Sequence, residues 1–502
     1  MKKTSALLAA ALAFAPFGRA QYTPPSPAVP VPGLIDESLR AADATFGAWD
    51  IGVNERVRFE DKDGAGTTHA GSNYDFFAAS PTSNTNDYWL SRLMPRIAYT
   101  QGFVSAVAEG RSSYSWGDDR FNPAAPGRAL ADNDGPAQLE LGYLLIGDLK
   151  TFPLQLKIGR QELTYGDQRL LGSAMWLNVP HTFDAAKIRY QGKVDVDLFA
   201  GNLVYSRGDH FDRSNSQDTL SGAYFDFPAI SQTQLTEAYV LARNVARGIV
   251  TDDWTQVAAP FRFPAPQDLY TVGFRTKTKP TANKAWDYGI EAMGQFGNRT
   301  AVFAGTSVPT AEAAPRLSQS AWAFVAQAGY TWKPSHLQPR LALIISAASG
   351  DKNAADNQSE TFQNLLPSNH GLYGAMDLTG LQNIEDLRLN YSIKPTSRIT
   401  LAADLHSQRL ETTSDYWYNA AGVPRSTPGA APGSGRGFGL NPSYSKDLGR
   451  EADLTAGWNP TRGILAEAGY SHFFRGRYID QSLAAVGARD ASYFYFQTIL
   501  NF

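Results

Sequence analysis

The sequence predicts an all-β fold, a transmembrane antiparallel β-barrel of about 18 strands. Three observations support this prediction. The chain ends on an alternating aromatic strand, segments with a two-residue hydrophobic period recur from about residue 46 to residue 502, and the connections between them alternate between short and long. Short periplasmic turns and longer extracellular loops are typical of outer-membrane barrels.

The strand count follows from these connections. Eight short turns are expected near 101, 151–153, 191–192, 228–234, 277–284, 333–335, 394–396 and 459–462. Nine long loops, rich in Gly, Asn, Asp and Pro, cover 61–87, 116–136, 163–181, 205–219, 243–267, 297–318, 348–382, 411–449 and 476–489. These connections join about 18 strands and leave both termini on the short-turn side. The segments 220–227 and 235–242 carry the weakest strand signal.

The last strand, residues 491–502, separates two kinds of side chain. Phe494, Phe496 and Leu500 share one face with Thr498, whereas Tyr495, Gln497 and Asn501 share the other. This alternation suits a strand with lipid on one side and water on the other. An edge strand of a soluble sandwich is the alternative for this segment alone.

The N-terminus favours export. Met1-Lys2-Lys3 is a positive region, residues 6–17 are apolar, and Gly18-Arg19-Ala20 offers small residues for cleavage before Gln21. We therefore expect a signal peptide at 1–20, a proline-rich periplasmic segment at 21–45 and a barrel in the bacterial outer membrane at 46–502.

The composition excludes several classes. With 45 basic and 48 acidic residues the net charge is −3, which argues against a nucleic-acid partner. No cysteine is present, so neither a disulfide framework nor a thiolate metal site is possible. The mean hydropathy of −0.31 and the absence of a long apolar run leave a barrel as the only membrane-spanning option.

Charged residues also follow the strand period. In the segments 49–59 and 384–394 the charged side chains share one face and the apolar side chains share the other. An arginine facing lipid at mid-membrane costs about 2–4 kcal/mol, so the charged faces should point into a wet lumen. Aromatic residues near strand ends on the apolar face fit interfacial girdles; they are Trp89, Tyr99, Trp286, Trp322, Trp332, Trp458 and Tyr470.

Strand parity places a basic set in this lumen. Its members are Arg56, Arg58, Arg92, Arg96, Arg111, Lys187, Arg189, Arg275, Arg388, Arg475 and Arg477. An acidic set faces it, formed by Glu109, Asp195, Asp197, Asp287, Glu291, Asp404, Glu451, Asp453 and Glu467. Two readings are open: ion pairs that brace the wall, or an arginine ladder along which an anionic polymer slides.

The sequence offers little for catalysis, and we expect neither an enzyme nor a bound metal or cofactor. The seven histidines have no metal-ligand spacing, and no nucleophile elbow appears. Ser471 and His472 are neighbours and point to opposite faces. The clusters 351–356 and 132–135 could hold Ca²⁺, although neither has EF-hand spacing.

Three stretches go beyond a generic barrel pattern. They are residues 159–184 with Gly159-Arg160-Gln161, residues 349–377 with Ser349-Gly350-Asp351, and Gly469-Tyr-Ser-His-Phe-Phe474. Together they resemble the alginate export family of outer-membrane barrels, over nearly the whole chain from about 46 to 502. The resemblance implies an eighteen-stranded monomeric barrel with an electropositive, arginine-rich constriction.

Some residues of this chain match the motifs of that family, and others depart from them. Arg160 matches the family's Gly-Arg-Gln and joins the candidate substrate-binding residues, as do Lys187 and Arg189 after the Phe-Asp motif. Arg160 nevertheless shares parity with apolar Ile158, so either a bulge turns it inward or it brackets a loop. Arg475-Gly476-Arg477 stands where many relatives carry a proline and an acid, which makes the external mouth more basic.

These observations predict a passive, anion-selective outer-membrane channel for an acidic, uronic-acid polysaccharide such as alginate, or for its oligomers. A general anion-preferring porin is the main alternative, and a barrel-borne hydrolase or adhesin is a weaker one. The expected partners are outer-membrane lipid, the acidic polysaccharide and a periplasmic polysaccharide synthesis machine. Sequence does not fix the direction of transport, the pore radius or which loops enter the lumen.

Overall fold

The computed structural model describes residues 33–64, 74–78, 84–118, 134–205, 211–246, 266–300, 316–353, 355–422, 424–425, 430–431 and 433–502. The expected signal peptide, residues 21–32 of the proline-rich segment and the cluster 132–135 lie outside the residues whose structure is described in full.

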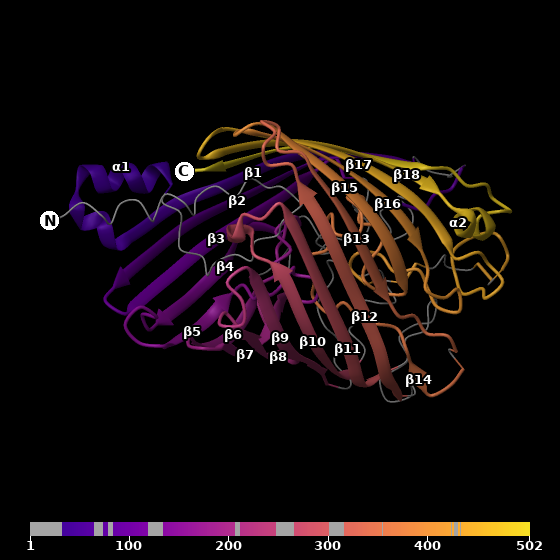
Figure 1. Cartoon of the computed structure of the whole chain (residues 1–502), viewed down its shortest axis with the longest axis horizontal. Helices are drawn as coiled ribbons and strands as arrows, with labels where there is room; N and C mark the ends of the chain where they lie inside the picture. Colours follow the sequence, from indigo (N-terminus) through magenta and orange to yellow (C-terminus); the bar gives the residue numbers. More distant parts are fainter. Residues whose placement is uncertain are drawn as a thin grey trace.

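The chain forms one closed antiparallel barrel (Figure 1). Nineteen strands share one sheet, and β14 has only two residues and runs parallel to β12 beside a loop, so eighteen strands build the wall. The strands are β1 (Trp49–Asp63), β2 (Thr85–Gln101), β3 (Val104–Trp116), β4 (Asp134–Ile146), β5 (Leu154–Gln161), β6 (Phe183–Tyr190), β7 (Asp195–Tyr205), β8 (Arg213–Asp226), β9 (Gln234–Val245), β10 (Gln267–Thr278), β11 (Trp286–Thr300), β12 (Arg316–Thr331), β13 (Arg340–Ala348), β14 (Gln358–Ser359), β15 (Ile384–Thr396), β16 (Ile399–Arg409), β17 (Asp447–Thr461), β18 (Ile464–Arg475) and β19 (Ala491–Asn501).

The predicted fold class is confirmed. The expected short turns and long loops mark the junctions between consecutive wall strands, although some strands run further than expected. β15 extends through the expected turn 394–396, and β8 begins within the expected loop 205–219. The weakly signalled segments belong to β8 and β9. The barrel closes where β1 pairs with β19, from Asn54 opposite Asn501 to Asp63 opposite Ser492. No helix in the described part of the chain is long and apolar enough to cross a membrane.

Outward and inward faces alternate along each strand, because neighbouring side chains point to opposite sides of a sheet. Along β16, Leu405 is exposed whereas Asp404 and His406 are buried. Aromatic pairs stand near both ends of the wall, including Trp49 with Tyr99 at the short-turn end. The outer surface is therefore the lipid face that the sequence predicts.

The long loops pack into the barrel instead of standing clear of it. Buried apolar side chains from several loops join inward-facing wall residues in one core; among them are Phe76, Leu171, Phe362, Met376, Leu381, Trp417, Phe438 and Tyr478. Loop 162–182, between β5 and β6, contacts β1 and β2. The loop end of the lumen is therefore occupied by a packed mass of chain.

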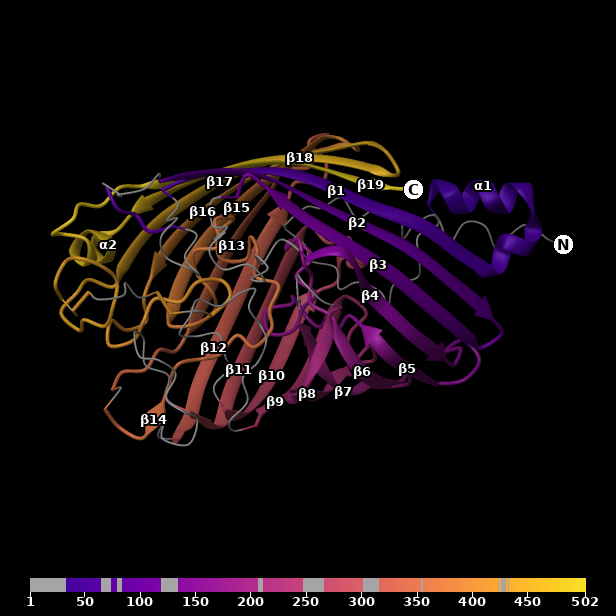
Figure 2. The same ribbon diagram turned by 180° about the vertical axis from the view of Figure 1, so that it is seen from behind.

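A short helix not expected from the sequence precedes β1. Helix α1 (Leu34–Ala42) is followed by the 3₁₀ turn η1 (Ala44–Ala48). Helix α1 and the C-terminal Phe502 lie at one end of the barrel, whereas α2 (Arg477–Ser482) lies at the other (Figures 1 and 2). A three-residue 3₁₀ turn, η2 (Pro280–Ala282), lies between β10 and β11.

Helix α1 covers the part of β1 that β19 does not reach. β19 pairs with β1 only from Asn54 onward, and Phe502 exchanges backbone hydrogen bonds with Val53. Beyond that point Ile51 N–H donates to Asp36 Oδ1 (3.1 Å), and Arg40 Nη2 donates to the carbonyl of Trp49 (2.5 Å). Side chains of the helix thus satisfy backbone groups that a neighbouring strand would otherwise pair.

Candidate functional site

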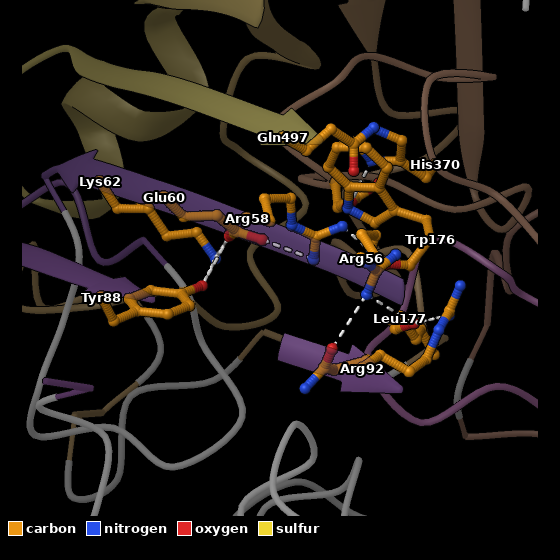
Figure 3. A network of polar contacts seen from close by, with 12 residues as sticks. Arg56, Arg58, Glu60, Lys62, Tyr88, Arg92, Trp176, Leu177, His370 and Gln497 are labelled. Carbon is orange, nitrogen blue, oxygen red and sulfur yellow. Dashed lines mark hydrogen bonds and ion pairs between the residues drawn. The ribbon is translucent and has the colours of Figure 1, made fainter. Parts of the chain in front are cut away.

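Arg56 and Arg92, two of the predicted lumen arginines, bind backbone carbonyls of loop 162–182. Arg56 Nη1 donates to the carbonyls of Met175 (3.0 Å) and Trp176 (2.9 Å), and its Nη2 donates to that of Leu177 (3.1 Å). Arg92 Nη1 donates to the carbonyls of Met175 and Leu177, both at 2.9 Å. Arg56 lies on β1 and Arg92 on the neighbouring strand β2, so the loop is held against the inner face of both strands (Figure 3).

Arg58 contacts the same loop through an aromatic ring. Its guanidinium lies 4.0 Å from the ring centroid of Trp176, and His370 stacks on that ring with centroids 3.6 Å apart and planes 4° apart. Figure 3 shows Arg58, Trp176 and His370 together. Tyr495 meets the Trp176 ring edge-on. The indole ring of Trp176 is therefore covered by the guanidinium of Arg58 and the ring of His370. Little of its surface is left on which a sugar could stack.

A second arginine cluster holds the middle of loop 162–182. Asp167 accepts from Arg275 (2.6 Å) and Lys277 (3.0 Å), and Arg275 also pairs with Glu237. Burial alone would raise the pKa of Asp167, but Lys277, Arg275 and Arg169 hold it well below its usual range. The carboxylate of Asp167 is thus a fixed anion that binds the loop to β10.

The loop between β13 and β15, residues 349–383, is held by β15 and β17. Arg388 donates to Asp404 Oδ1 (2.7 Å) and to the carbonyl of Gly371 (2.9 Å). From β17, Glu451 Oε1 accepts from Met376 N–H (2.8 Å) and Asp453 Oδ2 from Ala375 N–H (3.3 Å).

Gly374 is required where this loop passes β17. It has a φ of +105°, and a Cβ built there would lie 2.3 Å from Glu451 Oε2. Only glycine fits so close to a fixed carboxylate at that backbone angle.

Arg111 and Arg160 tie neighbouring strands to the residues before β8. Arg111 donates to Glu140 (2.6 Å) and Asp212 (2.8 Å). Arg160 pairs with Asp184 (2.8 Å) and donates to the carbonyls of Leu139 and Asp212. The β4–β5 and β5–β6 registers continue unbroken to Arg160, so no bulge turns it inward; it brackets a loop, the second of the two expectations for this residue.

Two predicted cations, Lys187 and Arg189, make looser contacts than the third, Arg96. Lys187 lies 3.5 Å from Asp197, and Arg189 lies 3.9 Å from Asp195 and 3.7 Å from Asp197. Their side chains keep 18% and 26% of their surface exposed. Arg96 donates to Asp50 (2.9 Å) and lies 3.6 Å from Glu109.

Arg475 and Arg477 differ from the expectation that they lie inside the lumen. Arg475 ends β18 and pairs at the rim with Asp480 (2.7 Å) and Asp490 (2.8 Å). Arg477 is exposed and begins α2, because the strand period stops at Gly476 and parity no longer applies. Both therefore belong to the external mouth.

Sequence reasoning missed Lys157. In β5, Leu154 and Ile158 are exposed on the outer face, and Lys157 lies on the other face, directly opposite Lys187 of β6. The two-residue period of β5 is the signal that places Lys157 inside, because Leu154, Leu156 and Ile158 alternate with it. Among the described residues, no group of three or more His, Asp or Glu side chains is arranged to hold a metal ion.

Most arginines of the expected ladder are thus bound to other groups of the protein. Arg56, Arg92, Arg111, Arg275 and Arg388 are at most 5% exposed and spend their donors on loop carbonyls or carboxylates. This arrangement is closer to the bracing reading than to a free ladder. Whether any of these residues contacts a substrate stays a prediction.

A family model described as alginate export matches residues 50–489. The chain belongs to the alginate export family. The match runs from the second residue of β1 through β18 and stops just before β19, so the resemblance drawn from the three sequence stretches is confirmed. No curated protein sequence matches the chain.

Solved porin structures share the fold of this alginate export family member. A BenF-like porin from Pseudomonas fluorescens Pf-5 aligns with a TM-score of 0.51 at 10% identity, covering 90% of this chain and 99% of that one. OpdO from Pseudomonas aeruginosa gives 0.51 at 10% identity, with 91% and 97% covered. OccK5 (OpdH) from the same organism gives 0.50 at 10% identity, with 91% and 98% covered. The chain is an outer-membrane, porin-like barrel.

Proposed function

We propose that this barrel is a passive, anion-selective channel for an acidic, uronic-acid polysaccharide or its oligomers. Family membership supports a polysaccharide as the transported class. The observation that carries anion selectivity is the group of lumen-side cations with loose ion pairs, Lys187 and Arg189 above all. Cations held 3.5–3.9 Å from their carboxylates keep donors for a passing anion.

Transport in this proposal needs no turnover chemistry. A weak, repeated interaction suits a conduit, because a polymer that binds tightly at one site cannot leave it. Lumen carboxylates such as Asp195 and Asp197 limit the strength of each contact. A concentration gradient, or a periplasmic synthesis machine behind the barrel, supplies the driving force, and the barrel acts as a monomer.

The reversal potential of the purified protein in a planar bilayer under a KCl gradient tests the proposal. Oligouronate is then titrated into one chamber, with a neutral oligosaccharide as the control. Anion selectivity with block by oligouronate alone is the expected result. Weak selectivity without block would overturn the polysaccharide assignment.

A general anion-preferring porin is the second candidate. It is favoured by the contacts of most inward arginines, whose donors are occupied by loop carbonyls or by carboxylates, which leaves few free donors for a long polymer. In that case small anions would pass, and oligouronate and neutral sugar would block equally little.

A further inference from the structure

Two lysines face each other across β5 and β6 on the inner side of the wall. Lys157 and Lys187 are direct partners in the antiparallel register, as are Gln155 and Arg189 one step nearer the short turn. The outer-face neighbours Ile158 and Ile188 are exposed to lipid, which fixes the inward direction of the lysines. Three cations therefore share one small area of the lumen wall.

This arrangement is unfavourable without an anion. Like charges directly opposite each other destabilise a pair of strands. Lys187 has Asp197 at 3.5 Å, whereas Lys157 has the ring of Tyr143, with its Nζ 3.8 Å from the ring centroid. In the part of the chain that the structure describes, no carboxylate lies within ion-pair distance of Lys157. Asp197 is moreover shared with Arg189.

Other inward cations contrast sharply with this group. Arg388 is bonded to Asp404 at 2.7 Å, and Arg111 to Glu140 at 2.6 Å. Those pairs are short, buried and complete. The three cations of β5 and β6 have no such short carboxylate pair, and the side chains of Lys187 and Arg189 are partly exposed.

The group also lies near the short-turn end of the barrel. Lys157 is close to the start of β5 at Leu154, and Arg189 is next to the end of β6 at Tyr190. Loop 162–182 leaves the opposite end of β5 and is fastened to β1 and β2. An anion entering from the periplasmic side meets this group before it reaches the packed loops.

We infer that Lys157, Lys187 and Arg189 form a carboxylate-binding site for a uronic-acid residue at the periplasmic entrance of the lumen. This inference rests on the proposed function and specifies where in the lumen the acidic sugar binds. One carboxylate oxygen meets the two ammonium groups and relieves their repulsion, while the guanidinium of Arg189 meets the other oxygen. Neutral sugars lack the charge that this site requires.

Current block in planar bilayers tests the site, with a short uronic-acid oligosaccharide added on the short-turn side of the full mature chain. Lys157→Gln should weaken block about tenfold, because a hydrogen bond to a charged group is lost. Lys157→Arg should keep most of it. Lys150→Gln, which removes an exposed lysine from the turn before β5, is the matched control and should leave block unchanged.

Thermal unfolding separates binding from bracing. Lys157→Gln removes a like-charge repulsion, so its Tm in detergent should equal or exceed that of the unmodified protein. A lower Tm would mean that Lys157 braces the wall, and unchanged block would also overturn the site while leaving the channel function intact. If the unmodified protein is not blocked by oligouronate at all, the proposed function itself fails.

Discussion

Asp36 and Arg40, one helical turn apart in α1, together replace a missing strand beside β1. Their side chains pair with each other at 2.8 Å, and each also binds one backbone group on the uncovered edge of β1. The Asp36 side chain is 1% exposed, so its charge depends on Arg40. The helix also reaches past β19 to the β17–β18 turn through the Glu37–Arg462 ion pair.

Arg40→Gln should destabilise the barrel by about 3 kcal/mol, because it leaves the buried carboxylate of Asp36 without its cation. Urea unfolding in detergent, followed by tryptophan fluorescence, measures the change. Ser38→Ala on the exposed face of the same helix is the control and should change stability by less than about 0.5 kcal/mol. Equal midpoints for both variants would contradict the role of α1 at the seam.

Replacing Arg56 and Arg92 together with Gln should loosen the segment 175–177 of loop 162–182. The two guanidinium groups donate to the backbone carbonyls of Met175, Trp176 and Leu177, and glutamine is too short to reach them. Single-channel conductance should rise, and the loop should become open to protease. Arg398→Gln in the exposed β15–β16 turn is the control. Unchanged conductance would show that the loop is held by other contacts.

Gly374→Ala should cost about 2–3 kcal/mol, because alanine would be strained at a positive φ and would meet the Glu451 carboxylate. The thermal midpoint in detergent measures this loss. Gly439→Ala, where an added Cβ meets no atom within 4 Å, should be nearly neutral. If both variants unfolded at the same temperature, the clamp on loop 349–383 would be weaker than its geometry indicates.

The contribution of Asp167 to stability should depend on pH. Its folded pKa is depressed, so the stabilisation is complete above the unfolded pKa of about 4 and is lost as the pH falls toward the folded pKa. The stability difference between the unmodified protein and Asp167→Asn should shrink by about 1 kcal/mol between pH 7 and pH 3. Chemical unfolding at the two pH values provides the test; a constant difference would contradict the depressed pKa.

The wall of this barrel was predictable because its signals are local. A two-residue period, a turn residue and an aromatic strand end each depend on a few neighbouring positions. Parity therefore placed Arg56, Arg92 and Arg388 on the inner face. It misplaced Arg475 and Arg477, which lie where β18 ends and α2 begins.

The partners of those arginines were not predictable, because they come from distant segments. Arg56 binds carbonyls about 120 residues further along the chain, and no sequence period encodes a loop that folds back into the lumen. Helix α1 gave too short a signal beside a proline-rich stretch to be recognised. The site at Lys157 was also not predictable, because it depends on the pairing of Lys157 with Lys187 across β5 and β6. The composition of the chain does not reveal that pairing.

The pairing of β1 with β19 determines the order in which this protein can be assembled. Asn54 and Asn501 contact each other across a separation of 447 residues, so the first strand waits with an open edge until the last one has been synthesised and delivered. Contacts between such distant segments carry a large entropic cost and form late. The wall of the barrel is consequently closed only when the two ends of the chain meet.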